Sequence, residues 1–202
     1  MIPKPISTFY GKITKRNAAR FFEDCMKVKD ERINWITEFA IESGANKQSI
    51  DLSRESLLPL WNSVASHVRW LTPAPFGPTD TVDKPEWFNY LYSKVAVRDM
   101  DSHSQHKGGY DVQSLWIMDG LAYYFGEVFV RTFHHMKWQS YFESRYDMSG
   151  MPHVLSSEWS RFNVCPWRQV ISALVGTWAP GLVPTASDLS DSFDALIRQA
   201  SS

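Results

Sequence analysis

Apolar residues recur at steps of three and four along much of the chain, and this spacing predicts helices rather than strands. The first predicted helix spans residues 15–43, with Thr14 as its N-cap. A second helix carries its apolar residues between 57 and 68 and has two alternative starts. It begins either at Ser53, a good N-cap, or at Leu58, because Pro59 is tolerated only in the first turn of a helix. Further helices are predicted at 85–97, at 166–175 and after a cap at Ser187.

The longest helical pattern covers residues 111–134, contains no proline and has Asp111 as its N-cap. One side of this central helix is an ordinary apolar stripe, made of Leu115, Met118, Leu121, Ala122, Phe125, Phe129 and Phe133. The other side mixes large aromatic, charged and small residues without a lysine: Gln113, Trp116, Gly120, Tyr124, Glu127, Arg131 and His134. Such a side is expected to pack under a neighbouring element or to line a concave wall.

A change of period marks a short β-region after the central helix. Polar and apolar residues alternate over 138–146, a turn follows at 147–150, and a second short strand is predicted at 153–156. We therefore predict an α+β fold, a mostly helical single domain over residues 1–202 with a small antiparallel sheet or hairpin around 138–157. Residues 1–12 are interpreted as an N-terminal extension, and the polar, glycine-containing segment 98–110 as a flexible surface loop.

The composition and net charge of the chain argue against some classes of partner. The chain is 44% hydrophobic with nine Trp, which suffices for a packed core, and its net charge is −1. A nearly neutral chain gives no bulk electrostatic reason to expect nucleic acid or a membrane as a partner. The strongest basic cluster, which acidic residues follow at once, is Lys12, Lys15, Arg16 and Arg20. Two widely spaced cysteines, Cys25 and Cys165, favour a reducing compartment, and no signal peptide or membrane span is recognisable, so a cytoplasmic location is expected.

Glu127 and Arg131 are the most informative charged residues, because they lie four positions apart in the orientation that favours an ion pair. The favoured interpretation is a structural ion pair that braces the fold. The alternative is a ligand- or partner-binding site walled by these two residues together with Trp116 and Tyr124. Asp119 is too far along and around the helix to form a two-carboxylate site with Glu127.

Other residues that could carry chemistry lack the neighbours that chemistry requires. His134 and His135 are adjacent, so both cannot face one metal ion from a helix, and His103 with His106 has no nearby carboxylate or thiol cluster. Cys165 has no adjacent base, which favours a buried, unreactive thiol. The common nucleotide, zinc-protease, hydrolase and redox motifs are absent. We therefore expect no catalytic residues, no metal and no cofactor, and the sequence favours a non-catalytic protein over an enzyme.

Three groups of residues, taken in order, carry a family resemblance. The first is 42–44 with the turn 52–57 and Leu60-Trp61; the second is Asp119-Gly120, Tyr124 to Glu127 and Arg131; the third is Trp138 with 162–166. This order resembles a family of small bacterial proteins of uncharacterised function, largely actinobacterial, with an S-x-E-S-L turn and a Y-x-G-E-x-x-x-R helix. Some members are similar to immunity proteins of bacterial toxin systems, which implies a protein that binds and blocks a toxin-like protein partner. Immunity proteins against nucleases are often strongly acidic, whereas this chain is nearly neutral, so a nuclease partner is not implied.

The leading hypothesis is therefore a cytosolic binding protein of the immunity type, which occludes another protein with an aromatic-rich surface. The alternative is a small-ligand-binding protein or enzyme, with a pocket walled by Trp116, Tyr124, Glu127 and Arg131 and gated by the 98–110 loop. A third hypothesis, a structural or dimerising protein, predicts a large exposed apolar patch. The sequence leaves the oligomeric state open.

Overall fold

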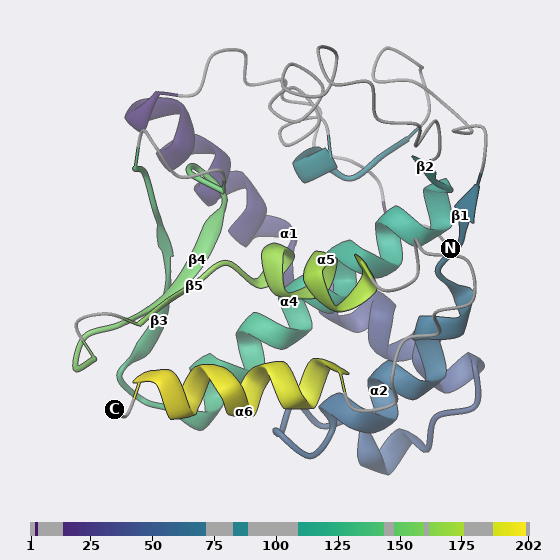
Figure 1. Ribbon diagram of the computed structural model, residues 1–202. Helices are drawn as coiled ribbons and strands as arrows, with labels where there is room; N and C mark the ends of the chain where they lie inside the picture. Colours follow the sequence, from purple (N-terminus) through teal and green to yellow (C-terminus); the bar gives the residue numbers. More distant parts are fainter. Residues whose placement is uncertain are drawn as a thin grey trace.

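The fold is α+β, as the sequence predicts: a mostly helical chain with a small antiparallel sheet at one side (Figure 1). The structure is a computed structural model. It describes Pro3 and residues 14–71, 83–88, 109–143, 148–159, 162–175 and 188–200. Among the described helices, none is long and apolar enough to cross a membrane.

Helix α1 (Lys15–Glu42) confirms the predicted first helix and its cap. The Thr14 side chain accepts a hydrogen bond from the backbone N–H of Asn17 at 3.2 Å, which satisfies one of the amides that a helix leaves unpaired at its start. The helix ends just before Gly44, whose φ of +102° reverses the chain at no steric cost.

Helix α2 (Leu57–Val64) begins between the two starts that the sequence allowed. Pro59 is its third residue and so lies in the first turn, where a missing N–H breaks no helical hydrogen bond. A turn precedes it, closed by the Ser56 N–H donating to Ser53 Oγ at 3.2 Å. Two 3₁₀ turns flank the region, η1 (Lys47–Ser49) and η2 (Ala65–His67).

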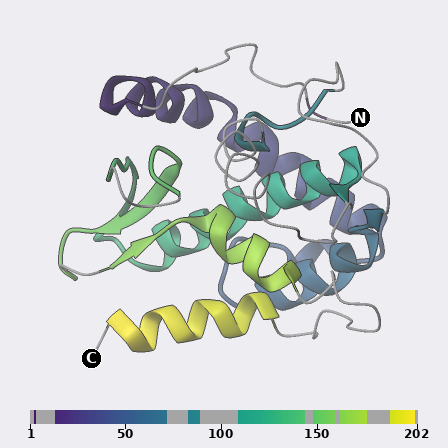
Figure 2. The ribbon, with the colours of Figure 1, turned by 45° about the horizontal axis from the view of Figure 1, so that its top comes forward.

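Helix α4 (Val112–Thr132) runs through the centre of the molecule, capped by Asp111, which accepts from the Ser114 N–H at 2.7 Å. Every residue from 114 to 129 is buried. Figure 2 explains why: α1 passes on one side, and α5 (Pro166–Val175) and α6 (Asp188–Ala200) lie on the other. The mixed side predicted from the sequence is as buried as the apolar side over this span, so it packs under neighbouring elements, one of the two arrangements expected for it.

Aromatic packing joins the later helices to α4. Phe193 of α6 stacks on Phe129 with ring centroids 4.2 Å apart, and Phe125 meets Phe129 edge to face at 5.2 Å. Each such side chain contributes about 1.5–3 kcal/mol by leaving water. Arg54, in the turn before α2, pairs with Asp194 of α6 through two nitrogens, so α6 also closes against the first half of the chain.

The sheet has the strand order β3-β4-β5, all antiparallel. Strands β3 (Met136–Ser140) and β4 (Pro152–Ser156) confirm the predicted hairpin, with Gly150 at φ +90° in its turn. The predicted first strand was misplaced: it begins two residues earlier and ends at Ser140 rather than 146, and residues 144–147 lie outside the described part. Strand β5 (Asn163–Val164) was not predicted, since two residues are too short for a period.

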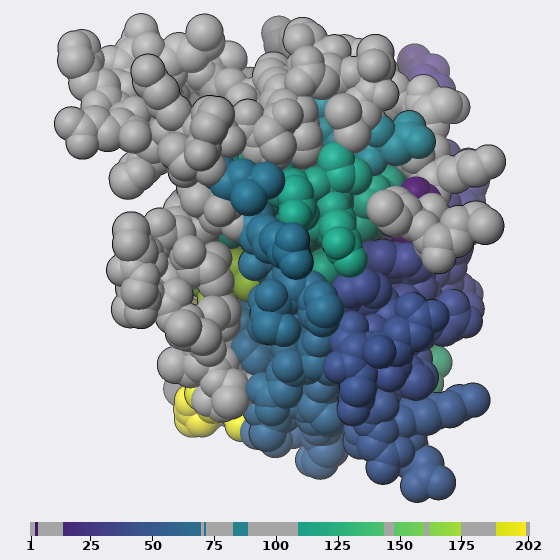
Figure 3. Space-filling model, turned by 90° about the vertical axis from the view of Figure 1, so that its right-hand side faces the viewer, coloured from purple at the N-terminus to yellow at the C-terminus, as the bar shows by residue number. Residues whose placement is uncertain are grey.

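A second, two-stranded ladder pairs β1 (Trp70–Leu71) with β2 (Gly109–Tyr110). The interpretation of 98–110 as a loop is therefore wrong for its last two residues, and 98–108 lie outside the described residues. Residues 86–88 are helical, in agreement with the predicted helix 85–97, whose remainder also falls outside. Figure 3 shows this side of the molecule, with residues from α2 to β1 (blue) beside the second half of α1 (indigo).

Candidate functional site

Two clusters of charged residues lie where α1 meets α4. The arginine cluster consists of Arg32 from α1, Asp119 and Trp116 from α4, Glu86, and Trp167 from α5. The glutamate cluster consists of Glu127 and Arg131 from α4, Lys29 from α1, and Trp138 from β3. In each cluster, a cation from α1 meets a carboxylate from α4.

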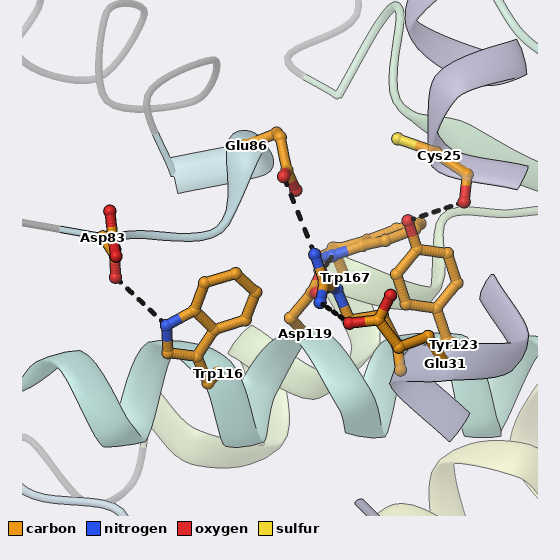
Figure 4. A network of polar contacts seen from close by, with 9 residues as sticks. Cys25, Glu31, Asp83, Glu86, Trp116, Asp119, Tyr123 and Trp167 are labelled. Carbon is orange, nitrogen blue, oxygen red and sulfur yellow. Dashed lines mark hydrogen bonds and ion pairs between the residues drawn. The ribbon is translucent and has the colours of Figure 1, made fainter. Parts of the chain in front are cut away.

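Arg32 is the centre of the arginine cluster and is fully buried. Its Nε lies 3.2 Å from Asp119 Oδ2, and its Nη2 lies 3.7 Å from Glu86 Oε1. The guanidinium carbon stands 4.5 Å above the ring of Trp116, a cation–π contact (Figure 4 labels the carboxylates and Trp116). A third carboxylate, that of Glu31, contacts Nη1 at 3.2 Å but is largely exposed. Two interior carboxylates, those of Asp119 and Glu86, thus lie beside the same buried cation.

The surroundings of Asp119 raise the pKa of its carboxyl group. Burial, reinforced by the negative charge of Glu86, raises its pKa to about 8, although Arg32 and a hydrogen bond from Trp167 oppose the shift. Trp167 Nε1 donates to Asp119 Oδ1 at 3.1 Å, whereas the contact of Asp119 Oδ2 with Arg32 Nε is not aligned as a hydrogen bond. The shift favours a proton on Asp119, which reduces its repulsion with the Glu86 carboxylate beside Arg32.

The thiol beside this cluster is not poised for nucleophilic chemistry. Burial raises the pKa of Cys25 well above its ordinary value, so the thiolate is disfavoured. Tyr123 donates its hydroxyl proton to the backbone carbonyl of Cys25 at 3.2 Å, a contact visible in Figure 4, and its own pKa is likewise raised by burial. Cys165 is buried as well, which agrees with the unreactive thiol expected from the sequence.

The glutamate cluster has the opposite balance, one buried carboxylate and two cations, and Lys29 Nζ also lies 3.5 Å from the exposed carboxylate of Asp30. Lys29 Nζ donates to Glu127 Oε2 at 2.6 Å, Trp138 Nε1 donates to the same oxygen at 3.1 Å, and Arg131 Nε lies 3.6 Å from Glu127 Oε1. Burial alone would raise the pKa of Glu127, but the two hydrogen bonds and the charges of Lys29 and Arg131 outweigh it and lower the pKa. Glu127 therefore stays ionised at neutral pH.

Gly126 sets the distance between α4 and the sheet. A Cβ at this position would overlap Cη2 and Cζ2 at the edge of the Trp138 indole and would lie 3.0 Å from Pro166 Cγ. The absence of a side chain lets the edge of the indole approach the helix closely, and the indole Nε1 donates a hydrogen bond to Glu127. Gly120 has the same role against α1, because its Cβ would stand 2.6 Å from Ile36 Cβ.

The four residues that the sequence singled out do not share one site. Glu127 and Arg131 are in contact, as predicted, but Arg131 is 57% exposed and Lys29 is the nearer partner. Trp116 belongs to the arginine cluster and donates from Nε1 to the Asp83 carbonyl at 3.1 Å. Tyr124 points elsewhere: its hydroxyl accepts from the Leu52 N–H at 2.8 Å and lies 2.6 Å from Ser56 Oγ.

Tyr124 holds the turn that precedes α2. Leu52 adopts φ +64°, a left-handed conformation that costs a residue with a branched side chain about 1–3 kcal/mol. The hydrogen bond to Tyr124 helps to keep it there. The Y-x-G-E helix and the S-x-E-S-L turn are therefore in direct contact, and Gly126 and Glu127 contact Trp138. The turn at 52–56 and Trp138 thus both contact α4 between residues 124 and 127.

Sequence reasoning missed Lys29, Arg32, Glu86 and the role of Asp119. One signal was present: Arg32 falls at the helical spacing of buried α1 residues, seven positions after Cys25 and four before Ile36. A charge within a buried stripe demands a partner. The identity of that partner could not be read from the chain, because Lys29 and Glu127 are 98 positions apart.

A third polar contact lies at the end of α4. His135 is buried, and its Nδ1 is 2.9 Å from Ser156 Oγ, while its Nε2 is 4.0 Å from Glu158 Oε2. Ser156 Oγ also accepts from the N–H groups of Glu158 and Trp159, at 3.0 and 2.7 Å. These two amides occupy the lone pairs of the serine oxygen, so its main role is to close the turn after β4.

Within the described residues, no group of three or more His, Cys, Asp or Glu side chains is arranged to hold a metal ion. His103 and His106 lie outside that part of the chain. Comparisons of the chain with protein-family models, with curated proteins and with solved structures found no match.

Proposed function

We propose that this chain is a non-catalytic binding protein that occludes another protein, in the manner of immunity proteins of bacterial toxin systems. One observation carries the proposal: the side chains of α4 that could act as acids or bases are taken up by interior partners. Asp119 is held by Arg32 and Trp167, and Glu127 by Lys29 and Trp138.

A general acid or base must reach a substrate proton at hydrogen-bonding distance. Asp119 and Tyr124 are at most 1% exposed, and Glu127 is 8% exposed, so their polar atoms face protein rather than solvent. A binding protein has no such requirement, and it benefits from a rigid scaffold that orders its surface before the partner arrives. The family resemblance supports the same class of function.

The surface beside the glutamate cluster has the side chains that protein interfaces favour. Arg131 is more than half exposed, and Trp138 is half-buried and donates a hydrogen bond from its indole to Glu127. Phe142, just beyond β3, is exposed as well. Arginine and aromatic residues held in fixed positions make strong contacts with partners, because little conformational freedom remains to be lost on binding.

Co-purification with a toxin-like protein encoded by a neighbouring gene tests this proposal. The partner is expected to bind the full chain and to lose its toxicity when the two are co-expressed. Arg131→Ala should weaken binding, whereas Tyr124→Phe, an interior change, should leave binding intact in folded protein. Absence of binding at micromolar concentrations in calorimetry would refute this function.

A second candidate, a hydrolase, rests on the distance of 2.9 Å between Ser156 Oγ and His135 Nδ1. The two amides that donate to the serine oxygen disfavour it, which is why it ranks second. A fluorophosphonate probe distinguishes the two classes. Labelling of the wild type that disappears in Ser156→Ala would support the hydrolase, and the absence of labelling would support the binding protein.

A further inference from the structure

Charge is strongly segregated along this nearly neutral chain. Residues 1–22 contain five Lys or Arg and no Asp or Glu, whereas the other 180 residues contain 16 basic and 22 acidic residues. The first acidic residue is Glu23. The net charge of −1 therefore results from a positive N-terminal segment and a negative remainder.

Helix α1 displays this segregation at the surface. Its first two turns contain Lys15, Arg16 and Arg20, while its last ten residues, 33–42, contain only Glu38 and Glu42 as charged residues. The partial charge of a helix is positive at its N-terminus and negative at its C-terminus, so the favourable arrangement is the reverse. Both ends of α1 thus contain charges that its own macrodipole disfavours, and self-stabilisation does not account for them.

The three cations also differ from the others on α1 in lacking partners. Lys15, Arg16 and Arg20 are all exposed, and none makes a side-chain hydrogen bond or ion pair within the described part of the chain. Further along the helix, Lys27 pairs with Asp24 and Lys29 with Glu127. In Figures 1 and 2 the N-terminal turns of α1 lie at the periphery of the molecule.

We infer that these three residues, Lys15, Arg16 and Arg20, form a basic docking surface for an acidic face of the partner protein, an inference that rests on the proposed function. Charge complementarity decides the occupant. Glu23 follows one turn after Arg20, and Asp30 is exposed further along the helix. A nucleic acid, whose phosphates repeat along its length, would be repelled there, whereas a protein face can change sign over the same distance.

The test uses the full chain with three charges reversed, Lys15→Glu/Arg16→Glu/Arg20→Glu. These acidic residues suit the positive end of the helix, so the variant is expected to fold and to melt no lower than wild type. Circular dichroism checks this before any binding measurement. The probe is a fluorescein-labelled polyglutamate peptide, measured by fluorescence anisotropy at low and at physiological salt.

The matched control reverses three other exposed cations that have no ion pair among the described residues, Lys47→Glu/Arg69→Glu/Lys137→Glu. Both variants have the same net charge, so any difference between them reports position. We expect the α1 variant to weaken polyglutamate binding by about tenfold or more, and the control to weaken it much less. Equal losses in the two variants would overturn the docking surface.

A labelled single-stranded DNA of equal charge and vesicles containing phosphatidylglycerol are the competing probes. If either binds the wild type more tightly than polyglutamate and loses binding in the α1 variant, the acidic-protein assignment is wrong. The toxin-like protein of the co-purification experiment separates the two proposals. If the toxin-like protein binds the wild type and the α1 variant equally, the docking surface fails and the proposed function stands. If the toxin-like protein binds neither of them while polyglutamate still binds the wild type, the proposed function fails and the basic surface stands.

Discussion

Between α1 and α4, the arginine cluster joins one cation to two interior carboxylates, whereas the glutamate cluster joins one carboxylate to two cations. The first is completely buried around Arg32, and the second lies at the margin, where Arg131 reaches solvent. The pKa of Asp119 is consequently raised and that of Glu127 lowered, although both carboxylates belong to one helix. The sign of a pKa shift therefore follows from the local ratio of charges and the depth of burial.

The largest expected effect is the loss of Arg32. Arg32→Met removes the buried cation that lies beside both Asp119 and Glu86, and breaking such a buried pair should lower the free energy of unfolding by about 3–5 kcal/mol. Urea unfolding measures the change. Lys29→Met is the matched control on the same helix, and because Glu127 keeps Trp138 and Arg131, its loss should be clearly smaller. Equal losses of unfolding free energy in the two variants would mean that burial does not distinguish the arginine cluster from the glutamate cluster.

Adding a methyl group at each glycine tests the packing beside the same clusters. Gly120→Ala presses against Ile36 Cβ, which moves only with the α1 backbone, and should cost about 2–3 kcal/mol or more. Gly126→Ala meets the outer atoms of a half-buried indole, which can turn outward, so a smaller loss is expected. In that variant Glu127 also loses its hydrogen bond from Trp138. Thermal unfolding and indole fluorescence follow the two effects, and the reverse order would contradict this account.

Sequence reasoning succeeded where the signal is local. The apolar period and the caps Thr14 and Asp111 located α1 and α4, and 166–175 matched α5 residue for residue. At α4 the same period separated two sides of different composition, and between residues 114 and 129 the mixed side packs under neighbouring elements, one of the two arrangements expected for it. Strands of two residues, such as β5, owe their existence to pairing partners and show no pattern of their own.

The candidate site shows the same division. The Glu127–Arg131 contact could be predicted from a spacing of four on one helix, yet the stronger contact of Glu127 comes from a helix nearly a hundred positions earlier. Trp116 and Tyr124 were grouped with Glu127 and Arg131 only because all four residues fall on the same side of the predicted helix. Their partners, Asp83 and the turn before α2, lie on different elements, so residues on one side of a helix entered separate environments.

The arginine cluster is also expected to make the stability of the fold depend on pH. The folded-state pKa of Asp119 is about 8, above the ordinary value of 3.8, so between these values the folded state binds the extra proton and stability falls as pH rises. His153, whose pKa burial lowers to about 4, acts oppositely between 4 and 6.5. The window from pH 6.5 to 8 is therefore expected to show the Asp119 effect, up to about 1.4 kcal/mol per pH unit. Asp119→Asn should flatten it, and an unchanged slope in urea titrations would contradict the protonated state.

The smallest expected effect on the free energy of unfolding concerns Arg131, the most exposed residue of the glutamate cluster. Its Nε is 3.6 Å from Glu127 Oε1, a longer contact than that of Lys29, and 57% of the side chain is exposed. Water and salt screen such a pair, so Arg131→Ala should change the free energy of unfolding by less than about 1 kcal/mol. The change should shrink further in high salt, because screening already weakens the pair in wild type. A loss as large as that of Lys29→Met would make Arg131 part of the scaffold. A small loss combined with weakened partner binding would instead assign Arg131 to the interface, with Lys29 and Trp138 holding Glu127 beneath it.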